Sequence, residues 1–196
     1  MPIFWRRVFI FLIALAPLGV IVYKTLSGLL GADPAKEIVL YTGEWAIYFL
    51  FITLAVTPLR RLVNFPIHFR WLQTHRRMLG LFTLFYALLH LLSFWVLILG
   101  SDISRFTKEM IERPYILVTI PAIVLLIVLG VTSTQCMMRR LGKNWHRLHK
   151  SIYLIAILAW VHVFMQVRSS YFEAVLYGVI IAILLLPRMY FALKKR

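Results

Sequence analysis

Long apolar runs alternate with short polar or charged segments along the whole chain. Each run is bounded by charged residues, proline or glycine, and its length is close to the roughly 20 residues that a helix needs to cross a bilayer. The runs occupy residues 8–23, 38–58, 78–99, 115–135, 151–167 and 172–187. This pattern predicts an all-α integral membrane protein, a six-helix transmembrane bundle with short loops between successive spans.

The composition leads to the same class of protein. Hydrophobic residues make up 62% of the 196 residues, against roughly 45–50% in a soluble domain. Six spans with short loops account for this length, so the sequence predicts a single membrane domain over 1–196. The single cysteine, Cys136, excludes an intramolecular disulfide and a thiolate-ligated cluster.

The formal net charge is +15, and the placement of the charges decides what it means. If the N-terminus is cytoplasmic, the inner segments hold 16 of the 22 Lys and Arg and none of the seven acids. These segments are 1–7, 59–77, 136–150 and 188–196. Such a distribution is typical of the positive-inside rule, so both termini are expected in the cytoplasm. The basic runs would then contact anionic lipid headgroups, and the charge gives no reason to expect nucleic acid.

Two of the six histidines, His90 and His162, fall well inside apolar spans. Ionisable side chains within a membrane are costly, usually face the bundle interior and often mark function. His90 lies 13 residues past Arg77, and His162 lies 12 residues past Lys150. Both spans run outward from these basic borders, so at about 1.5 Å per residue the two imidazoles lie at one depth, roughly 18–20 Å above the cytoplasmic border.

Two neutral imidazoles at one depth on two helices are what a bis-histidine haem requires, because the iron takes one nitrogen on each face of the macrocycle. His90 and His162 are therefore candidate axial ligands of haem b. Two alternatives stay open, namely histidines that form hydrogen bonds between packed helices and ligands of another metal. A bare metal would normally need more than two protein ligands.

A second pair of histidines lies at the cytoplasmic border, where His75 and His149 each precede basic residues. This pair suggests a second haem. The 13-residue spacing from His149 to His162 puts their side chains about 140° apart on an ideal helix, so His149 faces inward only if the helix end is irregular or tilted. His75 could instead be solvated among arginines. His146 is a possible substitute for either histidine, and His68 is expected in an interfacial loop.

No motif for other chemistry is visible in the chain. It has no GxGxxG, no phosphate-binding loop and no Cys/His cluster, so a nicotinamide or nucleotide site would have to be on a partner. All seven acids lie on the outer side, and neither buried histidine has a carboxylate at helical spacing to orient it. The sequence therefore argues against a Ser/His/acid hydrolase.

Several short motifs stand in a fixed order on the six spans. They are Gly31-Ala32-Asp33-Pro34, Thr57-Pro58-Leu59, Arg76-Arg77-Met78-Leu79-Gly80-Leu81, His90-Leu91, Arg113-Pro114-Tyr115, Thr132-Ser133-Thr134-Gln135, and the stretch from Arg140 to His149 that leads to His162. In the order and spacing of these motifs the chain resembles the MsrQ (formerly YedZ) haem-binding membrane subunits, within the group of ferric-reductase-like transmembrane domains. The resemblance runs nearly from end to end.

The resemblance implies cofactors, partners and a location. It implies one or two haem groups, with His90, His149 and His162 matching the family's haem histidines, whereas it gives His75 no place. It also implies FMN, with no residue assigned to that site. The implied partner is MsrP, a periplasmic molybdopterin enzyme that reduces methionine sulfoxide in oxidised proteins. The implied electron source is the quinol pool of a bacterial inner membrane.

The expected function is that of a membrane cytochrome b-type electron-transfer subunit rather than the catalytic subunit of a reductase. It would pass electrons from quinol through haem to an MsrP-like partner, docked on the outer loops at 24–37, 100–114 and 167–172. The charged amphipathic pattern of 100–114 also suits a surface helix on the membrane. Three other functions stay open: a direct transmembrane reductase of ferric ions or other metals, a haem carrier or sensor without enzymatic activity, and a transporter whose histidines relay protons.

Overall fold

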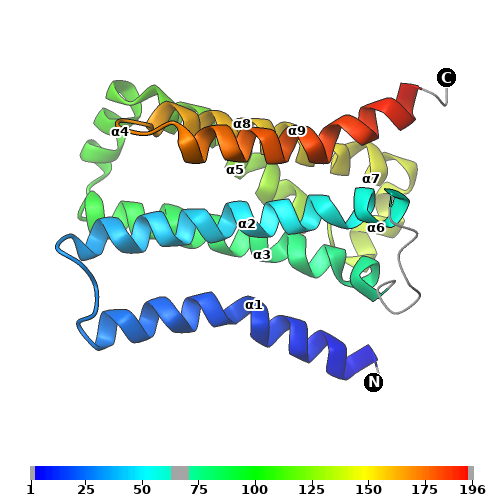
Figure 1. Cartoon of the computed structure of the whole chain (residues 1–196), viewed down its shortest axis with the longest axis horizontal. Coiled ribbons are helices and arrows are strands. Elements are labelled where there is room, and N and C mark those ends of the chain that lie inside the picture. The colour runs from blue at the N-terminus through cyan, green and yellow to red at the C-terminus, as the bar shows by residue number, and fades with distance from the viewer. Residues whose placement is uncertain (1–2, 63–70, 194–196) are drawn as a thin grey trace.

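The computed structural model of the chain describes residues 3–62 and 71–193, and all regular elements within these ranges are helical (Figure 1). In chain order the elements are α1 (Ile3–Leu26), α2 (Pro34–Leu62), α3 (Trp71–Ser93), the π-helical turn η2 (Phe94–Ile98), α4 (Ile103–Glu112), α5 (Pro114–Val131), α6 (Gln135–Leu141), α7 (Lys143–Leu148), the 3-10 turn η3 (His149–Ser151), α8 (Ile152–Gln166) and α9 (Phe172–Leu193). The all-α prediction is confirmed.

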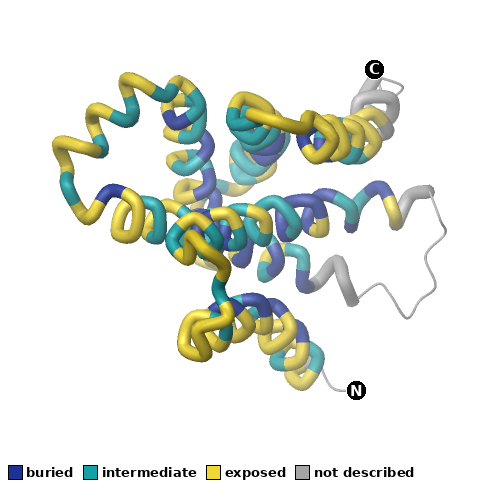
Figure 2. The backbone as a smooth tube through the Cα atoms, turned by 60° about the vertical axis from the view of Figure 1, so that its left-hand side comes forward, coloured by how far each residue is buried: buried dark blue, intermediate teal, exposed yellow. Residues whose placement is uncertain are grey.

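Five of the described helical segments are long and apolar enough to cross a membrane. They are Phe4–Leu26, Pro34–Leu59, His75–Ile98, Pro114–Val131 and Lys143–Gln166, and a shorter apolar segment covers Phe172–Leu186 in α9. Much of the helix surface is exposed (yellow in Figure 2) and carries large apolar side chains such as Phe9, Leu92 and Ile183. Exposed apolar surfaces of this extent suit lipid rather than water. The chain is a multi-pass membrane protein, and a sixth crossing by α9 stays a prediction.

The bundle has two distinguishable ends (Figure 1). One end carries α4 and the connection from α1 to α2, and we call it the α4 end; the other carries α6 and α7, and we call it the α6–α7 end. The first turn of α1 and the last turn of α9 both lie at the α6–α7 end. This agrees with the expectation that both ends of the chain share one side of the membrane, whereas their cytoplasmic placement stays a prediction.

The core of the bundle lies between α2, α3, α5, α8 and α9. The contact between α2 and α3 is the most extensive, and α5 packs closely against α8. At the centre of this core, Leu54 of α2 and Ala156 of α8 have no exposed surface, and Tyr177 of α9 joins the same cluster. Because lipid tails are as apolar as these side chains, close packing rather than the hydrophobic effect holds such helices together.

Local sequence signals set the helix boundaries near the site. The Asp33 carboxylate accepts a hydrogen bond from the Lys36 amide at 3.1 Å and caps α2, while Pro34 takes the first helical position, where no amide hydrogen is needed. Pro114 opens α5 in the same way. Gly142 ends α6 with a positive φ of 51°, a conformation that favours glycine, and turns the chain into α7.

One buried hydroxyl joins α1 to the rest of the bundle. Pro17 has no amide hydrogen and interrupts the hydrogen-bond ladder of α1, which bends near its middle (Figure 1). The Tyr86 hydroxyl of α3 enters this break, donating to the Ala14 carbonyl at 2.8 Å and accepting from the Leu18 amide at 3.2 Å. Tyr86 has no exposed surface, and its ring stacks on Phe49 with centres 5.3 Å apart. Backbone groups at the bend therefore fasten α1 to α3.

The segment 100–114, expected to be an amphipathic surface element, contains the helix α4. Asp102 caps this helix and accepts from the Ser104 amide at 2.8 Å. Hydrogen bonds from the Ser104 hydroxyl and then from the Ser104 and Arg105 amides hold the pKa of Asp102 below its usual value. The basic residues of the segment pair with acids of the same segment: Arg105 with Asp102 at 3.5 Å, Lys108 with Glu112 at 3.8 Å, and Arg113 with Glu109. The surface of α4 is therefore close to neutral.

Candidate functional site

His90 lies near the end of α3, just before the π-helical turn η2. Its Nδ1 bonds to the Val39 carbonyl of α2 at 2.8 Å. A carbonyl oxygen can only accept, so Nδ1 carries the proton, and Nε2 keeps its lone pair in the neutral ring. The backbone of α2 comes this close because Gly43 has no side chain: a Cβ there would lie 2.9 Å from His90 Nδ1.

Hydroxyl groups from both helices support this contact. The Thr42 hydroxyl lies 2.9 Å from the carbonyls of both Ile38 and Val39 and can donate to either. The Ser93 hydroxyl donates to the His90 carbonyl at 3.0 Å. The two hydroxyl oxygens are 3.4 Å apart, and Thr42 is buried. The position of His90 is therefore fixed by α2 and α3 together.

His162 lies in α8 and is held by the first turn of α5. Its Nδ1 bonds to the Tyr115 carbonyl at 2.9 Å, and the Tyr115 ring packs against the imidazole with centres 5.7 Å apart. The Gln166 side-chain amide, one turn further along α8, lies 3.0 Å from His162 Nε2. Because the carbonyl accepts and the amide nitrogen donates, His162 has the same tautomer as His90, with the proton on Nδ1.

A chain of polar contacts connects α4 to His162. The Arg113 guanidinium, at the junction of α4 and α5, donates to the Tyr115 hydroxyl at 3.0 Å. The same guanidinium pairs with Glu109 of α4. Tyr115 therefore holds His162 with its carbonyl and its ring, while its hydroxyl is tied to the surface helix.

The structure brings the two half-buried imidazoles of His90 and His162 together. Their ring centres are 6.3 Å apart, and their planes are inclined by 80°. A metal bound by imidazoles on opposite sides, at roughly 2 Å per bond, would hold the ring centres about 6 Å apart. Each ring also has Nδ1 anchored on a carbonyl, which is how proteins commonly orient histidines that bind metals.

This donor set fits the two axial positions of a haem iron. Gln166 would have to release His162 Nε2 when iron binds there. Among the described residues, no group of three or more His, Cys, Asp or Glu could hold a metal ion by itself, so a bare metal fits these residues less well. The ligand roles of His90 and His162 stay predictions.

His149 has different surroundings at the α6–α7 end. It opens the 3-10 turn η3 between α7 and α8, so the helix end is irregular, as an inward-facing His149 requires. The ring stacks on Trp145 with centres 4.0 Å apart, and its Nε2 lies 3.2 Å from the Thr132 hydroxyl. Thr132 has one proton, which it donates to the Val128 carbonyl at 2.7 Å. This favours a His149 whose proton is on Nε2, the nitrogen that an iron at this position would need.

The remaining histidines that the structure describes, His75 and His146, lie apart from the pair formed by His90 and His162. His75 is 2% exposed, so it is not a solvated border residue. Arg76, next to it, lies close enough to His149 for its charge to act on that ring. His146 packs edge-on against Trp145 with centres 5.1 Å apart, and His68 lies outside the described residues. A pairing of His75 with His149 stays a prediction.

Several residues of the site were not singled out by the sequence. Gln166 has a signal that would have found it, because it follows His162 by four residues and so shares its helix face. Val39 and Tyr115 contribute backbone carbonyls. Gly43 matters because it has no side chain, which leaves room for the His90 ring. No pattern of side-chain types reveals such roles.

Comparison with known proteins defines the class of this chain. Residues 42–160 match the family described as ferric reductase like transmembrane component. The match extends from α2 to α8 and covers more than half of the chain, so the chain belongs to the ferric-reductase-like membrane domains. No solved structure matches the chain significantly.

Similar proteins narrow this class. A protein of Herminiimonas arsenicoxydans is 44% identical over 190 residues, which cover 95% of this chain and 85% of that protein. A protein of Xanthomonas campestris pv. campestris (strain B100) is 46% identical over 170 residues, which cover 87% and 76%. Both are named protein-methionine-sulfoxide reductase heme-binding subunit MsrQ. The chain belongs to the MsrQ family, as its motifs predicted.

Proposed function

We propose that the chain is the haem-binding membrane subunit of a methionine sulfoxide reductase, with haem b held between His90 and His162. One observation carries the proposal: the ring centres of the two imidazoles lie 6.3 Å apart, and each ring has Nδ1 anchored on the backbone of another helix. The names of the MsrQ relatives support it as well. The chain acts as an electron-transfer subunit, and the catalytic site lies on a partner.

Haem supplies one-electron chemistry when it is bound, and the residues of the chain decide where it is held. The carbonyls of Val39 and Tyr115 keep the protons on Nδ1, which makes Nε2 more basic and fixes the orientation of each ring. Both rings are half-buried among packed helices, and the polarity of these surroundings would tune the potential of a haem held there. The protein thereby holds an electron carrier at a fixed depth of the bundle.

A second haem is proposed at the α6–α7 end, with His149 as one ligand and His75 as the candidate partner. The burial of His75 and the nearness of Arg76 to His149 support this placement. Iron binding at His149 Nε2 requires the ring to leave Thr132 and to move its proton to Nδ1. We therefore expect weaker binding at this end than between His90 and His162.

The proposed orientation puts the α4 end in the periplasm and the α6–α7 end in the cytoplasm of a bacterial inner membrane. Both termini are then cytoplasmic, and residues 1–196 form one domain. The distribution of charges supports this orientation, because 136–150 contains five basic residues and no acid, whereas the acids of α4 balance its basic residues.

The proposed electron donor is quinol, and the proposed acceptor is an MsrP-like periplasmic molybdopterin enzyme. The relatives are named as subunits of a methionine sulfoxide reductase, which supports a partner with that activity. The connections 24–37, 100–114 and 167–172 are the proposed docking surface. Bound FMN stays a prediction of the family resemblance, and flavin fluorescence of the purified, denatured protein checks it.

The test uses the purified protein in lipid nanodiscs. A quinol analogue should produce a reduced b-type absorption spectrum, and the molybdopterin partner with methionine sulfoxide should return the spectrum to its oxidised form. The partner without methionine sulfoxide is the control and should leave the haem reduced. A protein without haem, or a haem that the partner and substrate do not reoxidise, contradicts the proposal.

One observation favours a second candidate, a reductase that acts directly on metal ions. The matching family is described by its likeness to ferric reductase. Reoxidation of the haem by a ferric chelate, at the same rate without the partner, would favour this candidate. A haem carrier or sensor would show the spectrum but no reoxidation by either acceptor.

A further inference from the structure

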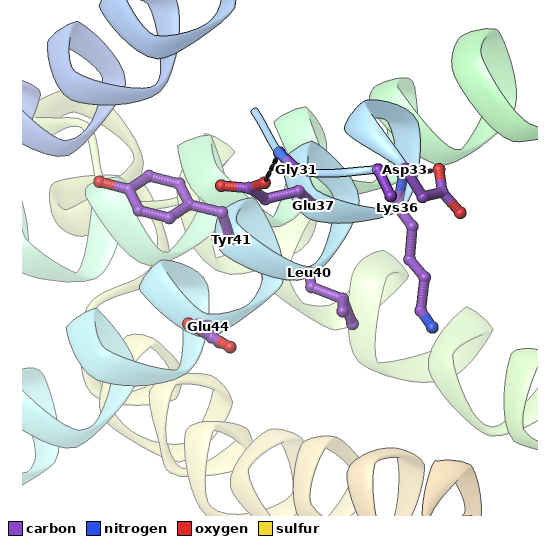
Figure 3. Close-up of a pocket in the computed structure, with 8 residues that line it drawn as sticks. Gly31, Asp33, Lys36, Glu37, Leu40, Tyr41 and Glu44 are labelled. Atoms are coloured by element: carbon purple, nitrogen blue, oxygen red, sulfur yellow. Dashed lines mark hydrogen bonds between the residues drawn. The ribbon is translucent and has the colours of Figure 1, made fainter. Parts of the chain in front are cut away.

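A pocket of about 350 Å³ lies beside the first three turns of α2 at the α4 end (Figure 3). Its wall includes Lys36, Leu40, Tyr41 and Glu44 of α2 and the end of the preceding loop. Glu37 fixes that loop, because its carboxylate pairs with Lys24 of α1 at 3.2 Å and accepts from the Gly31 amide at 2.9 Å. The rim of the pocket is therefore tied to two helices.

Glu44 is the member of this wall that packing does not explain. It lies within the apolar span Pro34–Leu59, where an ionisable side chain is costly and usually marks function. The ion pairs among the described residues do not include Glu44. The charged group that acts on it is another acid, Glu173 of α9, and the Glu44 side chain is exposed. An exposed carboxylate inside a membrane span needs another reason to be there.

The pocket is close to the histidine pair. Gly43, the residue before Glu44, is the point at which the backbone of α2 touches the His90 ring, with 2.9 Å from a built Cβ to Nδ1. Glu44 therefore lies in the same turn of α2 as the contact with the proposed haem ligand. A molecule bound beside Glu44 would be held by the turn of α2 that positions the His90 ring.

The chemistry of the wall restricts the ligand. Carboxylates repel anions, and the acids of the described residues do not converge as metal ligands do. Leu40 is 47% exposed on a membrane-spanning helix, so the pocket borders on lipid, and the Tyr41 ring adds an aromatic wall. A flat, neutral, lipid-soluble ring whose hydroxyls donate to a carboxylate matches these features.

We propose that this pocket binds the ring of a hydroquinone and that Glu44 accepts a proton from one of its hydroxyls. The inference rests on the proposed function, because it needs the electron acceptor between His90 and His162. Oxidation breaks both O–H bonds of the hydroquinone and yields the quinone, two protons and two electrons. Glu44 takes the first proton and passes it to water at the pocket mouth before the second leaves. The two electrons would be taken one at a time by the one-electron acceptor held between His90 and His162, which has to pass on the first before it can take the second.

The test measures binding of a fluorescent hydroxyquinoline N-oxide, a quinol analogue, to the purified protein in nanodiscs. Glu44→Gln removes the carboxylate and Leu40→Trp fills the pocket, and each should weaken binding at least about tenfold. Glu44→Asp should restore part of the affinity. Leu12→Trp, at a lipid-exposed leucine of α1, is the matched control and should bind as the unmodified protein does.

The haem spectrum after reduction with dithionite separates this inference from the proposed function. A normal spectrum together with unchanged analogue binding in Glu44→Gln and Leu40→Trp overturns the pocket and leaves the haem proposal intact. A protein that holds no haem but loses the analogue in both variants overturns the proposed function, while the pocket remains a binding site. Reduction by a soluble quinol should slow in Glu44→Gln and recover in Glu44→Asp.

Discussion

The two ends of the bundle hold their histidines in opposite ways. At the α4 end, His90 and His162 each bond from Nδ1 to a carbonyl of a neighbouring helix and keep the lone pair of Nε2. At the α6–α7 end, His149 is held through Nε2 by Thr132 and across its ring by Trp145. Neither of the first two rings needs to move a proton before it binds a metal, and His162 only has to release Gln166, whereas His149 must both exchange a hydrogen bond and move a proton.

The comparison shows that burial alone says little about a cofactor site. His75 is as deeply buried as many core residues, and burial does not reveal its tautomer. A backbone carbonyl orients a ring without the entropy cost of ordering another side chain. A histidine whose Nδ1 is anchored on the backbone of another helix is therefore the stronger sign of a metal ligand.

Removing an imidazole at the α4 end should have the largest effect. His90→Ala or His162→Ala should abolish the spectrum of the haem bound there, because the iron loses one of its two protein ligands. His149→Ala should leave that haem and remove only the second. Reduced-minus-oxidised spectra and haem content per protein measure both changes. Full haem content in His90→Ala or His162→Ala would contradict the claim that the histidines of the α4 end are the ones that bind haem readily.

Gly43→Ala should have the next largest effect. The added methyl group would lie 2.9 Å from His90 Nδ1, so the ring or α2 must shift, and haem affinity at the α4 end should fall about tenfold. Haem transfer to an apoprotein acceptor measures the affinity. Gly19→Ala is the matched control, since nothing lies within 4 Å of a Cβ there. Equal losses in the two variants would mean that helix packing in general, and not the contact with His90, is responsible.

Thr132→Val tests the other end. The variant removes the oxygen that accepts from His149 Nε2, so this nitrogen becomes available and the second haem should bind roughly 2–10 times more tightly. Thr132→Ser keeps the hydroxyl and should behave as the unmodified protein does. Stepwise haem titration separates the two sites. Weaker second-haem binding in Thr132→Val would show that the hydroxyl supports ligation instead of competing with it.

Tyr115→Phe should have a small effect, because His162 bonds to the backbone carbonyl of this residue and packs on its ring. Only the hydroxyl bond from Arg113 is lost. We expect haem affinity at the α4 end to change less than about threefold, within the range of one ordinary hydrogen bond. A loss as large as that of Gly43→Ala would mean that the side chain, and not the carbonyl, positions His162.

The smallest expected effect concerns pH and is confined to the α4 end. Hydrogen bonds from the Ser104 hydroxyl and from the Ser104 and Arg105 amides lower the pKa of Asp102. The carboxylate therefore stabilises α4 above its ordinary pKa of about 4, and this contribution is lost as the pH falls through the lowered value. Amide exchange in 103–106 should accelerate only when the pH falls below this ordinary pKa. Asp102→Asn should remove this dependence, and the α6–α7 end should not show it.

The sequence predicts the helices well because the residues next to each helix end determine where the helix begins or stops. Asp33-Pro34 and Arg113-Pro114 mark helix starts by rules that depend on a few neighbouring residues. The proximity of His90 and His162 is also predictable. Both spans start at a basic border, so the depth of each histidine in the membrane follows from the number of residues that separate it from that border. The rings' hydrogen bonds are not predictable, since they depend on which carbonyl another helix presents. The angle of about 140° between His149 and His162 assumes an ideal helix. It does not apply here, because η3 interrupts the helix at His149.

The insertion of Tyr86 into the bend of α1 has a consequence for the order of events in assembly. During synthesis α1 enters the bilayer before α3 has been made, and lipid offers no hydrogen-bond partner for the Ala14 carbonyl or the Leu18 amide. At that stage these two groups can bond only to each other, which keeps α1 straighter. When α3 arrives, the Tyr86 hydroxyl takes both groups and the bend opens. The first helix therefore reaches its final shape only after the third has joined it.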